Sequence, residues 1–165
     1  YWRDWSSDVC SSDLMGTLEG DLKDRLGTAI GMRSYAASVD FCSSERWTAL
    51  KAKGAMPQRL LFASTGTKDP ALSDTFYIGG LAAPDTVNTM PENTLLAFHD
   101  HGTLDGPLPT DGGDCEATIA AIEAAGVDVH ALAEKLQVDG RDSFNASWNS
   151  MIEDIAAKTR SLAGA

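Results

Sequence analysis

An apolar run at Leu60–Ala63 stops abruptly in the small, polar segment Ser64–Lys68. Continuous apolar runs of this length are typical of parallel strands that are covered on both faces. The pattern therefore predicts a strand near 59–64 that leads into a loop of hydroxyl and backbone N–H groups. Loops at the carboxyl ends of such strands are where α/β proteins hold their binding sites.

The same order of strand, loop and helix is repeated at residues 85–98. A strand is predicted near 86–90. Pro91 is expected in the first turn of the helix that follows, because proline tolerates that position, and Glu92 is favoured near the positive helix end. Two successive βα units are therefore predicted.

Short elements connect and follow these two units. Ser73 or Asp74 is expected to open a brief helical stretch that ends at Gly79-Gly80, before the second strand. After Gly102 a long loop containing residues 106–113 is predicted, rich in glycine and proline. The alternation of strands and helices before that loop indicates an α/β fold with parallel strands.

Helices are predicted upstream of the first strand. Apolar residues recur at i, i+4 and i+8 from Leu22 to Ile30, which predicts a helix through about Tyr35. Ser43 or Ser44 can cap a second helix, and Gly54 is expected to stop it. Both helices precede the strand near residue 60.

The chain beyond the long loop is predicted to be helical, over about residues 114–162. Asp114 is expected to cap a helix that Gly126 stops, and Asp128 to cap another that contains Leu132 and Leu136. A further, last helix is predicted from a stripe at helical spacing, Phe144, Trp148, Met151, Ile152 and Ile155. The stripe is interpreted as a packing face.

Charge and cysteine content narrow the class of protein. The 165 residues carry a net charge of −11, so neither nucleic acid nor an anionic membrane is expected as a partner. No apolar run approaches the roughly 20 residues of a membrane span. The three cysteines show no CxxC spacing, which fits a reduced, cytoplasmic compartment and argues against a zinc framework.

Two apparent site motifs do not fit their chemistry. His99-Asp100-His101 places the histidines at i and i+2, which point to different helix faces, so no metal site is predicted. Gly66–Asp69 lacks the first glycine and the closing Ser/Thr of a P-loop. Neither motif is therefore assigned a function.

Two longer stretches carry a family resemblance. ASTGTKDPALSDTFYI at 63–78 and DTVNTMPENTLLAFHDHG at 85–102 resemble the last two βα units of transaldolase, in the branch that also occurs fused to a glucose-6-phosphate isomerase. The resemblance runs from about Leu18 to Leu162. It implies an α/β fold that is the C-terminal portion of a TIM (β/α)₈ barrel, with its last two βα units followed by C-terminal helices.

The resemblance also implies an activity. Transaldolases transfer a dihydroxyacetone unit from sedoheptulose 7-phosphate to glyceraldehyde 3-phosphate, giving erythrose 4-phosphate and fructose 6-phosphate, in the pentose phosphate pathway. The reaction proceeds through a lysine Schiff base and needs no cofactor. The family's lysine lies in an earlier strand, so this chain is expected to lack it and to be inactive alone. A fused isomerase domain and self-association through open strand edges are further expectations.

The residues that match point to the phosphate end of the site. Ser64 is carried over from the family as a phosphate ligand, with Thr65 and Lys68 beside it. Other branches of the family have an arginine where this sequence has Gly66, so Lys68 is offset. Its alternative interpretation is an exposed residue at a helix start, paired with Asp69.

The rim of the site and the function each have an alternative. Asn88 and Thr89 are predicted to shape the same rim, with capping of the strand end as the other interpretation. The alternative to an enzyme is a non-catalytic helical module that binds a phosphate ligand or a partner protein. The two hypotheses differ in whether a lysine-bearing strand exists upstream.

Residues 1–14 differ in character from the rest. Asp4–Leu14 resembles the in-frame translation of a short-read sequencing-library adapter, and neither helix nor strand periodicity runs through it. The segment is therefore interpreted as a non-native tail, with a short polar N-terminal tail as the alternative. A complete barrel takes roughly 250 residues, so residues 15–165 are interpreted as a C-terminal fragment whose gene continues upstream of Met15.

Overall fold

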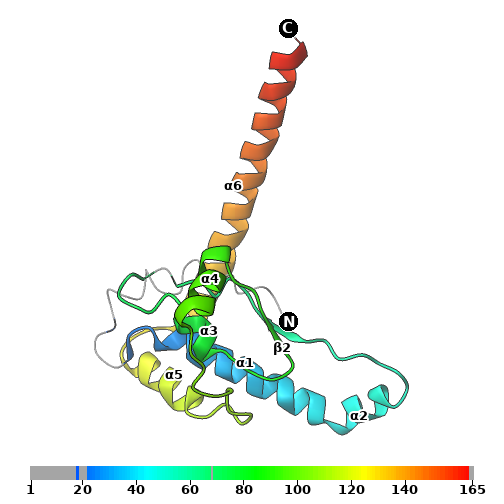
Figure 1. Ribbon diagram of the computed structural model, residues 1–165, viewed down its shortest axis with the longest axis vertical. Coiled ribbons are helices and arrows are strands. Elements are labelled where there is room, and N and C mark those ends of the chain that lie inside the picture. Colours follow the sequence, from blue (N-terminus) through cyan, green and yellow to red (C-terminus); the bar gives the residue numbers. More distant parts are fainter. Residues whose placement is uncertain (1–17, 19–21, 68, 164–165) are drawn as a thin grey trace. The chain divides into compact units, whose positions relative to one another are not determined.

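The computed structural model describes residues 18, 22–67 and 69–163 (Figure 1). The interpreted tail at 1–14 and Lys68 lie outside the described residues. The elements of the described part are α1 (Arg25–Ser43), α2 (Glu45–Lys51), β1 (Leu60–Phe62), α3 (Phe76–Gly80), β2 (Thr86–Asn88), α4 (Glu92–His101), α5 (Cys115–Ala124) and α6 (Val129–Ala163). The chain divides into two units, Tyr1–Val127 and Asp128–Ala165.

β1 and β2 form a parallel pair, in the register Leu60 to Thr86, Leu61 to Val87 and Phe62 to Asn88. Both strands lie inside the segments predicted from sequence, and each is three residues long. The hydrogen bonding continues past β2, because the Thr89 N–H donates to the Phe62 carbonyl at 2.9 Å. The described chain is therefore α/β and helix-rich, with two parallel strands whose carboxyl ends lie side by side.

The apolar core of the first unit joins β1 to the surrounding helices. Tyr35, Phe62, Leu81 and Leu108 are buried together. α1 comes close to this cluster at Gly31, where a side chain would begin 2.4 Å from the Leu81 Cδ2 atom. A larger residue at this position would force the Leu81 side chain to move within the core.

α1 is longer than the sequence predicted. The helix was expected to end at about Tyr35 and instead continues to Ser43, through a segment with good helix formers such as Ala36 and Ala37. It ends where the Ser44 side chain accepts a hydrogen bond from the Trp47 N–H at 3.2 Å and so caps α2. Serine is a preferred residue at the start of a helix, so the boundary between α1 and α2 falls at Ser44.

α5 covers α1, and the two helices lie against each other (Figure 1). Ile119 and Ile122 of α5 are buried. Asp114 stands at the predicted start of α5, but its side chain makes no capping bond. The carboxylate instead accepts a hydrogen bond from Arg25 Nη2 at 2.8 Å. A long-range ion pair thus replaces the expected local cap.

The second unit is one helix of 35 residues, α6. Its start agrees with the sequence, because Asp128 Oδ1 accepts a hydrogen bond from the Ala131 N–H at 2.9 Å. The expectation of two separate helices is wrong, since α6 runs through Gly140 without a break. A single glycine costs only about 1 kcal/mol in a helix, so it does not by itself end one.

Candidate functional site

The carboxyl ends of β1 and β2 form a polar edge, made of Ser64, Thr65, Asn88 and Thr89. The Thr65 side chain is buried, and its hydroxyl donates to Asn88 Oδ1 at 2.5 Å. The hydroxyl oxygen of Thr65 also lies 3.1 Å from the Thr89 carbonyl oxygen. The Thr65 N–H donates a hydrogen bond to that same carbonyl. These bonds fix the loop after β1 to the end of β2.

Ser64 stands at the exposed part of this edge. Its backbone has a φ of +54°, in the left-handed region that non-glycine residues seldom adopt. Such a conformation costs on the order of 1–2 kcal/mol. The Thr89 hydroxyl supports it by accepting a hydrogen bond from the Ser64 N–H at 3.3 Å. Backbone strain of this kind is concentrated at binding sites, where a fixed geometry is required.

The loop then passes beside the start of α4. A side chain at Gly66 would begin 3.0 Å from Pro91 Cγ and 3.3 Å from Thr94 Oγ1. Glycine thus permits the close approach of the loop backbone to the first turn of α4. That turn has Pro91 at the capping position and no side-chain cap. Uncapped N–H groups and the helix dipole favour anions at such an end.

Four of the five residues predicted for the site are therefore brought together. Ser64, Thr65, Asn88 and Thr89 lie at the polar edge, whereas Lys68 lies outside the described residues. The Thr65 hydroxyl donates to Asn88 Oδ1 at 2.5 Å, with the Thr89 carbonyl a second acceptor at 3.1 Å, and Ser64 lies at the exposed surface of the edge.

Sequence inspection missed a cluster that anchors the far end of the same loop. Asp69 Oδ1 accepts a hydrogen bond from the Ala71 N–H at 2.8 Å. Its other oxygen lies 3.6 Å from Lys23 Nζ, which also lies 3.9 Å from Asp24 Oδ2. Lys23 and Asp69 are far apart in the sequence, so no local pattern indicates the pairing.

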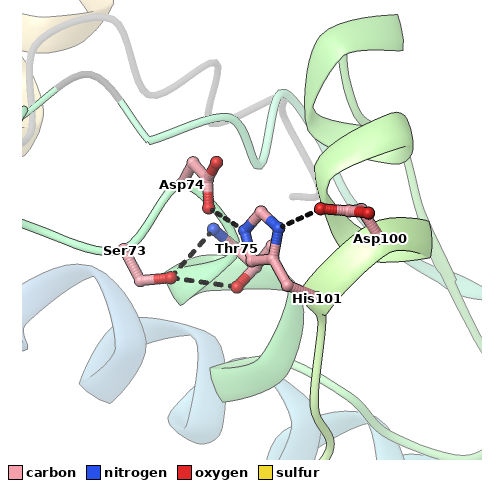
Figure 2. Close-up of polar contacts among 5 residues, drawn as sticks. All are labelled: Ser73, Asp74, Thr75, Asp100 and His101. Carbon is pink, nitrogen blue, oxygen red and sulfur yellow. Dashed lines mark hydrogen bonds and ion pairs between the residues drawn. The ribbon is translucent and has the colours of Figure 1, made fainter.

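A second polar cluster lies where α4 ends (Figure 2). His101 Nε2 is 2.9 Å from Asp74 Oδ1, and His101 Nδ1 is 3.3 Å from Asp100 Oδ2. The hydrogen bond to Asp74, followed by that to Asp100, raises the pKa of His101 above its usual 6.5. The cluster ties the end of α4 to the turn at 73–75, in which the Thr75 N–H donates to Ser73 Oγ.

The described lysines lie outside the strands. Lys51, Lys53, Lys135 and Lys158 are exposed, and Lys23 pairs with two carboxylates. A lysine that forms a Schiff base needs a buried, apolar setting that favours the neutral amine. None of these five has that setting. Among the described residues there is also no group of three or more side chains suited to hold a metal ion, nor a helix that could cross a membrane.

Comparison with known proteins gives a consistent result. Residues 15–155 match the family described as transaldolase/fructose-6-phosphate aldolase. The chain is 43% identical to a transaldolase of Arthrobacter sp. (strain FB24) over 145 residues, which are 87% of this chain and 39% of that protein. It is 44% identical to a transaldolase of Frankia alni, over 87% of this chain and 39% of that protein. It is also 44% identical to a transaldolase of Thermobifida fusca, over 82% of this chain and 37% of that protein. The chain thus spans about two fifths of the length of these relatives.

Proposed function

Because the chain belongs to the transaldolase/fructose-6-phosphate aldolase family, we propose that it is the C-terminal part of a transaldolase and forms the phosphate-binding end of the active site. The proposal rests chiefly on Ser64, held in a left-handed conformation at the exposed carboxyl end of β1. The adjacent loop packs against the uncapped start of α4. These features together favour an anion.

The substrates proposed for the complete enzyme are sugar phosphates. It moves a dihydroxyacetone unit from sedoheptulose 7-phosphate to glyceraldehyde 3-phosphate in the cytoplasm, through a lysine Schiff base in a TIM barrel. Ser64 donates a hydrogen bond to the phosphate, and Lys68 adds a positive charge, as the sequence predicts. Thr65 holds the loop through Asn88 and Thr89, and contributes to phosphate binding only when its proton is redirected.

The described part of the chain supplies phosphate binding and not the covalent step. Its five lysines lack a buried apolar setting, and Lys68 follows a polar, glycine-containing loop. β1 and β2 also pair only with each other within the described residues, so each keeps one open edge. Open edges favour pairing with further strands. We expect these to come from the rest of the barrel or, in its absence, from another copy.

Calorimetric titration of the 165-residue chain tests phosphate binding. We expect it to bind fructose 6-phosphate and to show no heat with fructose, which lacks the phosphate. Ser64→Ala should weaken binding about tenfold, the effect of losing one charge-assisted hydrogen bond. Ser147→Ala, an exposed serine of α6, serves as the matched control and should bind normally. Equal binding of fructose and fructose 6-phosphate would contradict the proposal.

Borohydride trapping tests the covalent step separately. Borohydride reduces a Schiff base to a stable adduct, which intact-mass measurement detects. We expect the mass of this chain to be unchanged after incubation with fructose 6-phosphate and borohydride. An adduct on any of its six lysines would show that the chemistry resides in this chain. The predicted result, combined with phosphate binding, would place the covalent step outside this chain.

A further inference from the structure

The loop after β1 is anchored at both ends, by different partners. At its start, Thr65 is bonded to Asn88 and to the Thr89 carbonyl. At its end, Asp69 turns the chain by accepting a hydrogen bond from the Ala71 N–H, and its carbonyl accepts another from the Leu72 N–H at 3.1 Å. The loop geometry therefore depends on how firmly Asp69 itself is held.

Asp69 is held by Lys23. The Asp69 side chain is only 4% exposed, and the Oδ2 atom that faces Lys23 has no hydrogen-bond partner in the described part of the chain. Burial of an unpaired carboxylate is costly, so a nearby ammonium group is needed for Asp69 to remain in place. Lys23 lies just before α1, and the pairing thus connects the phosphate loop to the start of that helix.

Asp24 orients the same lysine. Its side chain is 7% exposed, and its Oδ2 atom lies 3.9 Å from Lys23 Nζ. The Asp24 backbone has a φ of +64°, which turns the chain immediately before α1. Two buried carboxylates thus share one lysine. Lys23 Nζ is thereby held between the two carboxylates.

We propose that Lys23 is a positioning residue, which holds the phosphate-binding loop in its binding geometry through Asp69. The inference rests on the proposed phosphate site. A loop that is fixed before the ligand arrives loses less conformational entropy on binding, so its affinity is higher. Lys23 would therefore raise the affinity for sugar phosphates without contacting them.

The test is calorimetric titration of the full chain with fructose 6-phosphate. We expect Lys23→Met to weaken binding on the order of tenfold, and Lys23→Arg to restore most of the affinity because it keeps the charge. Lys135→Met, which disrupts an ion pair with Asp139 within α6, is the matched control and should bind normally. Melting curves establish that each variant is folded at the temperature of titration.

Two measurements separate positioning from other roles. The double variant Lys23→Met/Asp69→Asn should bind more tightly than Lys23→Met, because it no longer buries an unpaired carboxylate. The salt dependence of binding should be the same in Lys23→Met and the parent chain, whereas loss of a direct phosphate ligand would reduce it. Normal binding by Lys23→Met, or a reduced salt dependence, would overturn the inference.

Failure of the inference can be told apart from failure of the proposed function. If the parent chain does not bind fructose 6-phosphate, or Ser64→Ala binds as the parent does, the phosphate site itself is wrong. If Ser64→Ala is weakened and Lys23→Met is not, the site stands and Lys23 has no part in forming it. Each of these results is decisive for one of the two statements.

Discussion

α1 and α6 carry similar sequence signals and differ in what surrounds them. α1 buries Leu26, Ala29 and Tyr35 within its unit. α6 buries no residue within its own unit, and Trp148 is 61% exposed there. Both helices show apolar residues at helical spacing. The comparison teaches that periodicity identifies the apolar face of a helix, but not the surface that it packs against.

The helix that packs against α1 is α5, and polar side chains as well as apolar ones join the two helices. Arg33 makes two hydrogen bonds of 2.6 Å to the carboxylate of Glu116, and Arg25 bonds to Asp114. Both pairs join α1 to α5 at the margins of an apolar contact. Bidentate arginine–carboxylate pairs fix the relative orientation of two helices as well as their proximity. Within α6 the described ion pairs are local, as at Lys135 and Asp139.

The largest expected effect comes from matched isoleucine substitutions in the two units. Ile122 of α5 is fully buried, whereas Ile152 of α6 is 46% exposed. Ile122→Ala should lower the free energy of unfolding by about 2–4 kcal/mol through lost burial and a cavity. Ile152→Ala should lower it by less than about 1 kcal/mol. Urea unfolding followed by circular dichroism measures both.

A large effect of Ile152→Ala would break the comparison. It would show that the stripe on α6 is covered in solution by another part of the protein or by a second copy. Repeating the measurement over a range of protein concentrations distinguishes these two sources, because only association between copies depends on concentration.

A smaller effect on stability is expected at acidic pH, from the ion pair between Arg33 and Glu116. The hydrogen bonds from Arg33, followed by its charge, hold the pKa of Glu116 below its usual 4.5. The stabilisation is therefore present above pH 4.5 and is lost as the pH falls through the lowered pKa of the folded state. Glu116→Gln should flatten the decline of the urea midpoint between about pH 5 and 2.5. Glu153→Gln on α6 is the control, and an equal flattening there would contradict the assignment.

The smallest effect on stability is expected as the pH rises above neutral, from the titration of His101. Asp74 and Asp100 raise the pKa of His101 above 6.5, so its contribution is complete below that pH and is lost as the pH rises through the raised value. His101→Gln should remove this pH dependence from the melting temperature between about pH 6 and 8.5. His99→Gln, on the same helix, should retain it. Unchanged pH dependence in His101→Gln would place the titrating group elsewhere.

Features set by neighbouring residues in the sequence, such as helix caps and strands, were predictable, whereas ion pairs between distant residues were not. Ser44 caps α2 as its type suggests, and the apolar run at Leu60 became one of two parallel strands. Asp114 was expected to cap α5, but Arg25 attracts its carboxylate across the fold. Two separate helices were expected after Asp128, but a single helix, α6, runs from Val129 to Ala163.

In the candidate site, too, some features could be predicted from the sequence and others required the folded structure. The positions of Ser64 and Thr89 at the polar edge could be predicted, because each follows a predicted strand and the ends of parallel strands lie side by side. The left-handed backbone of Ser64 and the hydrogen bond from Thr65 to Asn88 could not be predicted, because both depend on the folded geometry of the loop. The pairing of Lys23 with Asp69 likewise requires the folded chain.

The most direct test of the central claim is an NMR titration of the isotope-labelled chain with fructose 6-phosphate, followed through its backbone amide signals. The account predicts saturable shifts confined to residues 64–68, 88–90 and 92–94, with the amides of α6 unchanged. Fructose at the same concentrations should shift none of them. Shifts confined to α6, or no saturable shift at the polar edge, would contradict the claim that this chain forms the phosphate-binding end of a transaldolase site.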